Sequence, residues 1–279
     1  MNETDLRDSV AGLFDRSAET YDAVGVDFFA VFARHLLDDA GLRPGERVLD
    51  IGCGRGAVLF PAAERVGPAG SVTGIDLSPG MVERTTRDIR ARKLATVTAE
   101  VMDAQEPTLP DASFDVVLAS AVVFFLPDPL AGLRAWHRLL RPGGRLGVTL
   151  FGGNDPRWSG IERVFRPFVP PAMIQAMVNP ESPVVSQENF TRALGTAGFT
   201  GIASETREHA IRFTGPEQWV DWSLSHGQRA FWEFVPEERR SRVRSEVLGE
   251  LDRLRAPDGG IVMRQVVRYT VATADSSGR

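Results

Sequence analysis

One short stretch limits what this chain can fold into. Residues 47–56 read Arg-Val-Leu-Asp-Ile-Gly-Cys-Gly-Arg-Gly, an apolar run followed by three glycines at alternate positions. The apolar run predicts a strand in the middle of a parallel sheet, and residues 57–66 predict a helix. Glycine has no Cβ, so the loop between them can turn sharply and approach a ligand. Open α/β sheets bind their ligands at this place, where a strand ends.

The acid inside this stretch indicates which ligand is expected. Asp50 stands at the end of the predicted strand, where a carboxylate repels a pyrophosphate and attracts an ammonium or hydroxyl group. The spacing is Asp-x-Gly-x-Gly-x-Gly, not the Gly-x-Gly-x-x-Gly of dinucleotide sites. The stretch therefore disfavours an NAD-dependent dehydrogenase.

The stretch resembles motif I of the class I S-adenosylmethionine-dependent methyltransferases, and four further signatures of that family follow in order. They are Val72–Ser78 for the second strand and its acid, Met102–Ala104 after the third, Ser113–Val117 for the fourth, and Leu140–Gly144 before the fifth. The resemblance is closest to the branch with ubiquinone-pathway and bacterial natural-product enzymes. It implies a Rossmann-like, doubly wound α/β fold with a seven-stranded sheet of order 3-2-1-4-5-7-6, its last strand antiparallel, and a helical cap.

By this resemblance the cofactor is S-adenosylmethionine, and no metal is expected. Asp50 and the backbone of the loop with Gly52, Gly54 and Gly56 would hold the methionine end. An ammonium needs an anion or a carbonyl, and a carboxylate suits the amides of a helix N-terminus.

The nucleoside would be held by residues at the ends of the next strands. Asp76 would accept both ribose hydroxyls, and Leu77 would pack on the adenine. Asp103 would accept the exocyclic amine while the Ala104 amide donates to the ring. Ser120, after the fourth strand, completes the cofactor set. A single acid of this kind can also be a helix cap; the spacing of all three favours the cofactor.

Two residues are candidates for the catalytic step. A sulfonium methyl is already activated, so the protein mainly aligns the acceptor, and a base is needed only where the acceptor must lose a proton. His226 is the best base candidate, and Tyr21, in a segment that resembles a lid, could close over the reacting groups. Either side chain could instead be a packed residue without a catalytic role.

Aromatic side chains predict an apolar acceptor pocket. Phe124 and Phe125 follow the fourth strand, where many relatives carry a polar group, and Phe28, Trp219 and Trp222 would extend the pocket. Most of these rings individually could simply form a small core. The pocket suits an aromatic, polyketide or terpenoid acceptor. Methylation at carbon is slightly favoured over O-methylation with His226 as base, and a non-catalytic cofactor-binding protein is the alternative of another class.

The order of predicted elements gives the domain organisation. Strands are expected near 47–51, 71–75, 96–101, 114–119, 144–150, 199–213 and 261–272, and helices near 4–14, 26–40, 57–66, 79–92, 129–140 and 187–197. The parts are residues 1–40 for N-terminal helices and lid, 41–150 for the cofactor-binding core, 151–186 and 214–258 for cap insertions, 187–213 and 259–274 for the rest of the core, and 275–279 for a tail.

Composition excludes several classes of partner. The net charge of −5 offers no broad basic surface for nucleic acid, and no apolar run approaches a membrane span. The single cysteine and the polar N-terminus favour a cytoplasmic protein.

The N-terminal helix also suggests an assembly. Its apolar stripe of Leu6, Val10, Leu13 and Phe14 must be buried somewhere, since a short helix is marginal alone. We expect a homo-oligomer in which this helix is exchanged between subunits, and folding of the helix onto its own domain is the alternative.

Overall fold

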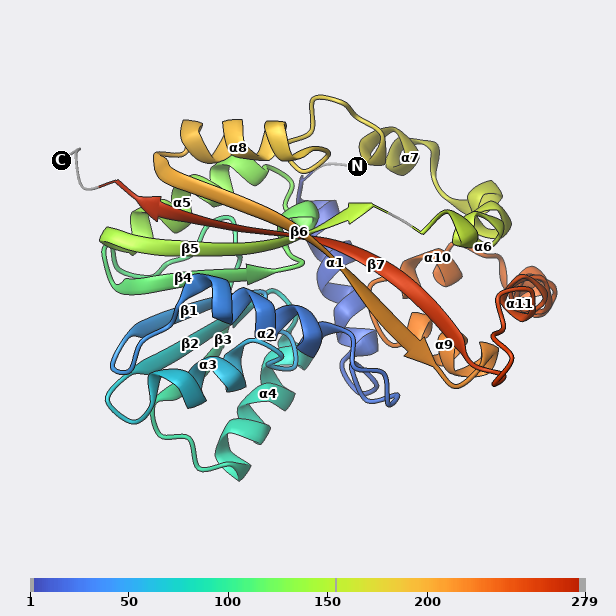
Figure 1. Cartoon of the computed structure of the whole chain (residues 1–279), viewed down its shortest axis with the longest axis horizontal. Helices are drawn as coiled ribbons and strands as arrows, with labels where there is room; N and C mark the ends of the chain where they lie inside the picture. The colour runs from blue at the N-terminus through green and yellow to red at the C-terminus, as the bar shows by residue number, and fades with distance from the viewer. Residues whose placement is uncertain (1–2, 154, 276–279) are drawn as a thin grey trace.

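A single twisted sheet runs through the molecule (Figure 1). The computed structural model describes residues 3–153 and 155–275, so the predicted tail beyond Asp275 lies outside the described residues. The strands in this part are β1 (Arg47–Ile51), β2 (Ser71–Asp76), β3 (Val97–Val101), β4 (Phe114–Ser120), β5 (Leu140–Gly153), β6 (Phe199–Phe213) and β7 (Ile261–Ala274). Their order is β3-β2-β1-β4-β5-β7-β6, and β7 runs antiparallel to both of its neighbours. The predicted fold is confirmed.

Helices cover the sheet and extend beyond it. They are α1 (Glu3–Ser17), α2 (Phe29–Ala40), α3 (Leu59–Val66), α4 (Pro79–Ala91), α5 (Pro129–Leu139), α6 (Ser159–Phe165), α7 (Pro171–Met177), α8 (Gln187–Thr196), α9 (Pro216–Leu224), α10 (Arg229–Glu233) and α11 (Glu237–Asp252). Single turns η1 (Val123–Phe125), η2 (Pro156–Trp158) and η3 (Arg166–Phe168) lie between them.

The sheet is buried between two helical layers. α2, α3 and α4 pack on the near face in Figure 1, where Leu36, Leu59 and Ile89 join one core cluster. α5 and α8 pack on the other face, where Leu133 and Leu194 join a second cluster. The central β1 is buried along four of its five residues, which explains its continuous apolar run.

Local chemistry explains where the helices around the sheet begin. The Ser78 hydroxyl accepts from the Met81 amide at 3.1 Å at the start of α4. The Asp128 carboxylate accepts from two amides at the start of α5. Each of these caps is followed by a proline, whose missing N–H costs nothing in a first turn.

Some elements differ from the predicted ranges. β5 extends to Gly153 instead of ending near residue 150, because β7 pairs with it along that length. α2 begins at Phe29, after Phe28, whose amide bonds to the Val26 carbonyl in a turn. α9 ends at Leu224, so His226 follows the helix, although its ring still packs against Trp222 with centroids 4.1 Å apart.

The cap helices and α1 lie beyond the carboxyl ends of the parallel strands. α6, α9, α10 and α11 gather at one end of the molecule (Figure 1). α1 packs against α4 and α10 of its own chain, where Arg16 donates to both carboxylate oxygens of Glu233 at 2.9 and 2.6 Å. The Asp15 carboxylate accepts from the Gly80 amide at 2.8 Å. Exchange of α1 between subunits stays a prediction.

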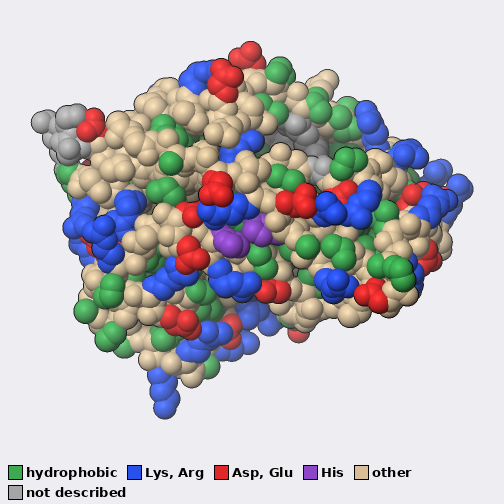
Figure 2. All heavy atoms as spheres, viewed as in Figure 1, with side chains coloured by type: hydrophobic (Ala, Val, Ile, Leu, Met, Phe, Trp, Pro, Cys, Tyr) green, Lys and Arg blue, Asp and Glu red, His purple; other side chains and the backbone are tan. Residues whose placement is uncertain are grey.

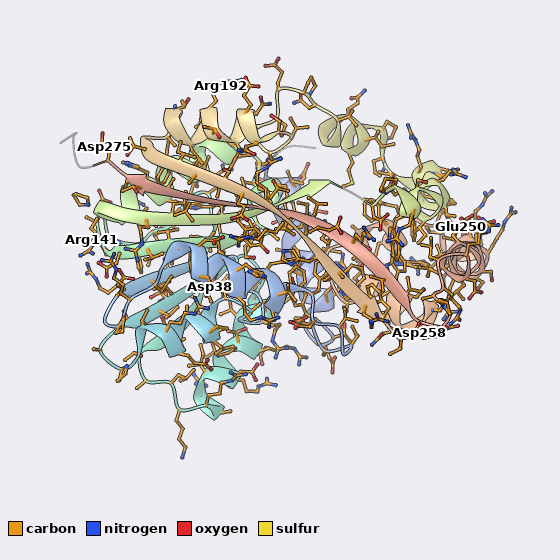
Figure 3. The ribbon with its side chains drawn as sticks, in the orientation of Figure 1. Asp38, Arg141, Arg192, Glu250, Asp258 and Asp275 are labelled. Atoms are coloured by element: carbon orange, nitrogen blue, oxygen red, sulfur yellow. The ribbon has the colours of Figure 1, made fainter. Side chains whose placement is uncertain are left out.

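The exterior carries charges of both signs. On the face shown in Figure 2, arginine, lysine, aspartate and glutamate side chains are interspersed. In Figure 3, Arg141 and Arg192 lie at the rim of the fold and Asp38 lies over α2; the side chains of Asp38, Arg141 and Arg192 are 64, 51 and 65% exposed. Among the described helices, none has both the length and the apolar character that a membrane crossing requires.

Candidate active site

A narrow crevice opens where β1 and β4 end, as an open α/β sheet predicts. It brings together residues that sequence reasoning had singled out, Tyr21, Asp50, Gly52, Gly54 and Ser120. The remaining lining residues are Asp22, Phe29, Cys53, Arg55, Ala57 and Val58. Phe29 and Asp22 belong to none of the cofactor signatures in the sequence, so their position in the crevice could not be predicted. It depends on how the chain around the start of α2 folds back over the end of β1.

The glycine loop has the conformation that its sequence requires. Gly52, Gly54 and Gly56 have φ of 64, 48 and 84°, in the left-handed region that favours glycine. A Cβ on Gly52 would lie 2.5 Å from Val122, and one on Gly56 would lie 2.4 Å from Phe60. The loop is therefore packed tightly from behind while its open side faces the crevice.

Asp50 is a buried acid that lacks a partner at one oxygen. It is 1% exposed, and its Oδ2 atom has no hydrogen-bond partner among the described residues. Burial, together with the charge of Asp76, raises the pKa of Asp50 well above its usual range. A bound ammonium would supply the missing donor and favour the ionised carboxylate, so this acid fits the methionine end of the expected cofactor.

Asp76 is already ordered by backbone donors. Its Oδ2 accepts from the Gly54 amide at 2.8 Å and its Oδ1 from the Ser78 amide at 2.9 Å. These bonds hold the carboxylate plane at the end of β2 and link it to the glycine loop. Burial raises the pKa of Asp76, and the backbone donors oppose that shift. Each oxygen keeps a second lone pair for a ribose hydroxyl, and the neighbouring Leu77 is half-buried.

Asp103 has a partner that the sequence did not reveal. Its Oδ1 accepts from the Gln105 amide at 2.7 Å, and its Oδ2 lies 3.0 Å from Nε of Arg7 on α1. The Ala104 carbonyl accepts from the Trp136 indole at 2.7 Å, which fixes this turn against α5. The proposed adenine end is thus bounded by α1.

Tyr21 covers the glycine loop. Its ring stacks on Phe29 with centroids 5.3 Å apart and an interplanar angle of 14°, and Phe14 of α1 meets it edge-on at 6.2 Å. A Cβ on Gly54 would lie 3.9 Å from this ring. Burial raises the pKa of Tyr21, so its hydroxyl stays protonated. Tyr21 lines the crevice beside the glycine loop, and its role as a lid residue stays a prediction.

His226 lies deep among aromatic rings. It is 5% exposed, and its ring centroid is 4.1 Å from Trp222, 5.8 Å from Phe29 and 5.9 Å from Phe28. Its Nδ1 is 2.7 Å from the Trp222 carbonyl, a distance that requires the proton on Nδ1. Burial lowers the pKa of His226 to about 4, so the imidazole is neutral at pH 7.

The aromatic side chains predicted to line an acceptor pocket pack on one another, and Phe28, Trp219 and Trp222 are only 2 to 3% exposed, so the pocket stays a prediction. Phe125 contacts Phe14, with centroids 5.2 Å apart, and Phe124 lies 5.5 Å from Phe151. Phe151 is 37% exposed and was missed, because it stands in the unexpected extension of β5. Phe28 and Trp222 are buried against each other at 4.9 Å. Trp219 stacks on Trp158 at 5.6 Å, within the cap.

In the part of the chain that the structure describes, no group of three or more histidine, cysteine, aspartate or glutamate side chains is arranged to hold a metal ion.

Comparisons with known proteins agree with this geometry. A family model described as a methyltransferase domain matches residues 48–144. The chain is 38% identical to nocamycin O-methyltransferase of Saccharothrix syringae, over 95% of this chain and 99% of that one. It is 42% identical to aklanonic acid methyltransferase of Streptomyces sp. (strain C5), over 63% of this chain and 80% of that one. Among solved structures it is similar to a phosphoethanolamine N-methyltransferase of Haemonchus contortus in complex with S-adenosylhomocysteine, with a TM-score of 0.55. The two chains are 20% identical, and the alignment covers 87% of this chain and 52% of that one, so the likeness concerns the fold.

Proposed function

Because the chain belongs to the class I S-adenosylmethionine-dependent methyltransferases, in their natural-product branch, we propose that it methylates an acidic oxygen of a small, largely apolar acceptor. When bound, S-adenosylmethionine supplies a methyl group on a sulfonium, so that a C–S bond breaks and a C–O bond forms in one displacement. The work left to the protein is to hold both partners in line and to exclude water. Asp50 and Asp76 would hold the cofactor, and Tyr21 would close over it.

The environment of His226 is the main reason for proposing that the methylated oxygen is acidic. Its Nδ1 is engaged by the Trp222 carbonyl, and the ring is enclosed by Phe28, Phe29 and Trp222. An imidazolium formed there would have lost its hydration and gained no carboxylate partner among these contacts. Such a histidine is a poor base for an alcohol or an ordinary phenol. The acceptor oxygen should therefore be ionised before it binds, as a carboxylate or an acidic enol is.

The names of two relatives support this proposal. One is an O-methyltransferase, and the acceptor named in the other is an acid. The sequence alone slightly favours carbon as the methylated atom, because the aromatic wall could stabilise a developing cation. Methylation at carbon is retained as the second candidate on the ground of the Phe28, Phe124 and Phe151 rings.

The stability of the new bond to alkali distinguishes these candidates. The protein would be incubated with methyl-labelled S-adenosylmethionine and a metabolite extract, and labelled products would be treated with mild alkali. We expect label that is released as methanol from an ester, or that mass analysis assigns to an enol ether. Label bound to carbon, stable to alkali and acid, would overturn the choice of oxygen.

A matched variant tests the role of His226. His226→Asn retains a donor near the Nδ1 position but cannot act as a base at neutral pH. We expect turnover to fall less than about tenfold, with no ionisation lost from the pH–rate profile near neutrality. A loss of about a hundredfold or more, with the disappearance of such an ionisation, would favour a phenolic or hydroxyl acceptor with His226 as base.

A further inference from the structure

One acid of the crevice has no role in the site described so far. Asp22 lines the crevice together with Asp50, and it belongs to residues 18–28, which join α1 to α2. Within the part of the chain that the structure describes, its carboxylate makes no hydrogen bond or ion pair. Asp22 is an exposed residue, whereas Asp50 is 1% exposed, so a bound ligand can reach the Asp22 carboxylate.

The backbone at Asp22 has a conformation that few side chains tolerate. Its φ is 55°, in the left-handed region, where aspartate and asparagine occur more often than most other residues. Two hydrogen bonds hold the turn around it. The Tyr21 amide donates to the Ser17 carbonyl at 2.8 Å, and the Ala23 amide donates to the Thr20 carbonyl at 3.0 Å. Backbone outliers concentrate at functional sites, so this one supports a role for the side chain that it orients.

The chain on both sides of Asp22 is tied to the walls of the site. Arg55 of the glycine loop donates from Nη1 to the Ala18 carbonyl at 3.0 Å. Gln218 of α9 donates from Nε2 to the Val24 carbonyl at 3.0 Å. Because Asp22 lies between these two anchors, its position relative to the crevice is fixed from both sides.

The charges that line the crevice favour a cation. Among the described lining residues, Asp22 and Asp50 are acids and Arg55 is the one base. The guanidinium of Arg55 is already engaged, since it donates to the Asp88 carboxylate at 2.7 Å and to the Ala18 carbonyl. A positively charged group of a ligand would therefore be attracted to the two carboxylates, with little opposition from Arg55.

The charge of Asp22 acts on the groups that enclose the crevice. Burial raises the pKa of Tyr21, and the charges of Asp22 and Asp76 raise it further, so the Tyr21 hydroxyl lies within electrostatic range of both carboxylates. Partial burial raises the pKa of Asp22 to about 6, while the charge of Asp27 adds to this shift and that of Arg55 opposes it. Asp22 is therefore largely ionised at pH 7.5, and a cation beside it would lower its pKa again.

We propose that Asp22 binds the ammonium group of S-adenosylmethionine from the segment before α2, while Asp50 binds the same group from the end of β1. An ammonium has three N–H donors, so one carboxylate leaves donors for a second. The sulfonium is a less suitable partner, because a carboxylate beside its methyl group would compete with the acceptor as a nucleophile. This inference goes beyond the proposed function, since it concerns the cofactor and holds whichever atom of the acceptor is methylated.

Two ligands that differ only in the ammonium test this role without turnover. S-adenosylhomocysteine carries the ammonium, and its deaminated analogue carries a hydrogen atom in that place. Calorimetry with the full-length protein at pH 7.5 measures both affinities. We expect wild type to prefer S-adenosylhomocysteine and Asp22→Asn to reduce this preference by about tenfold or more, because a hydrogen bond between two charged groups is lost. The affinity for the deaminated analogue should stay the same or rise, since its carboxylate is no longer repelled by Asp22.

Asp27→Asn is the matched control. Asp27 lies in the same segment, but its side chain is 58% exposed and pairs with Arg34 at 3.1 Å. This variant removes one negative charge without changing a residue that lines the crevice, so it should keep the wild-type preference. Asp22→Gly is a second test variant, because glycine adopts a φ of 55° without strain, and it should behave as Asp22→Asn does. Thermal unfolding of the ligand-free proteins checks that each variant is folded.

The two ligands separate a binding role of Asp22 from a merely structural one. Equal weakening of both ligands in the Asp22 variants would mean that the side chain only supports its segment, and it would overturn the proposal. A preference that is unchanged in these variants, or that falls equally in Asp27→Asn, would overturn it as well. The choice of oxygen as the methylated atom is decided separately, by the alkali treatment of the labelled product.

Discussion

His226 should make the folded protein sensitive to mild acid. Its pKa is about 6.5 in an unfolded chain and about 4 in the fold, because burial among aromatic rings disfavours the charged ring. Between these values the unfolded state binds more protons than the folded state. The contribution to stability is therefore complete above pH 6.5 and is lost as the pH falls towards 4. From pH 7.5 to pH 5 the loss amounts to about 2 kcal/mol.

Urea unfolding of wild type and His226→Asn at these two pH values measures this contribution. Asparagine can keep the hydrogen bond to the Trp222 carbonyl but does not titrate, so the other ionisable groups are common to both proteins. We expect wild type to lose about 2 kcal/mol more than the variant on going from pH 7.5 to pH 5. The raised pKa values of Asp50 and Asp76 act in the opposite direction and cancel in this difference.

Equal losses in the two proteins would refute the reasoning. That result would mean that the imidazole is hydrated or paired when protonated, and it would return His226 to the list of candidate bases. A larger loss in the variant than in wild type would refute it equally.

Three further predictions concern the cofactor and α1. Asp76→Asn should weaken S-adenosylmethionine binding by about 2 kcal/mol or more in calorimetry, because a charged acceptor of two hydroxyls is lost; affinity within twofold of wild type would contradict the ribose assignment. Cofactor binding should release protons and should tighten as the pH rises, because the ammonium of the cofactor requires ionised Asp50. Calorimetry in buffers of different ionisation enthalpy measures this proton release, which should be absent in Asp50→Asn. Deletion of residues 1–14 removes Arg7 from Asp103 and should lower turnover while the sheet domain stays folded. Light scattering on the full-length and truncated proteins tests the predicted exchange of α1, and a full-length protein that is a monomer would rule this exchange out.

The residues of the predicted cofactor site could be named from the sequence because they follow a local rule. Asp50 and Asp76 each stand at or next to the carboxyl end of a buried parallel strand, and those strands are neighbours in the sheet. Linear order alone therefore brings such side chains to one edge. The glycine loop is equally local, since its positive φ angles concern single residues.

Other features depended on contacts between distant segments. Arg7 reaches Asp103 only because α1 packs on the sheet domain beside α4, and Phe151 contacts Phe124 only because β5 continues along β7 beyond residue 150. His226 is an ordinary candidate base in the sequence; the rings of α2 and α9 that surround it make it neutral.

Arg268 of β7, which is 8% exposed and whose Nε and Nη1 atoms have no hydrogen-bond partner among the described residues, illustrates the limit most clearly. In the sequence it is one arginine of the predicted last strand, no different from Arg264. Its burial and its lack of an acid are properties of everything packed around it, and no pattern of neighbouring residues encodes the absence of a partner. The sequence by itself predicted the sheet, because strands and helices follow short-range periodicity, and it predicted the cofactor and the class of reaction through its resemblance to a known family. The tertiary structure decided which charges are desolvated, because burial depends on contacts between segments that lie far apart in the sequence.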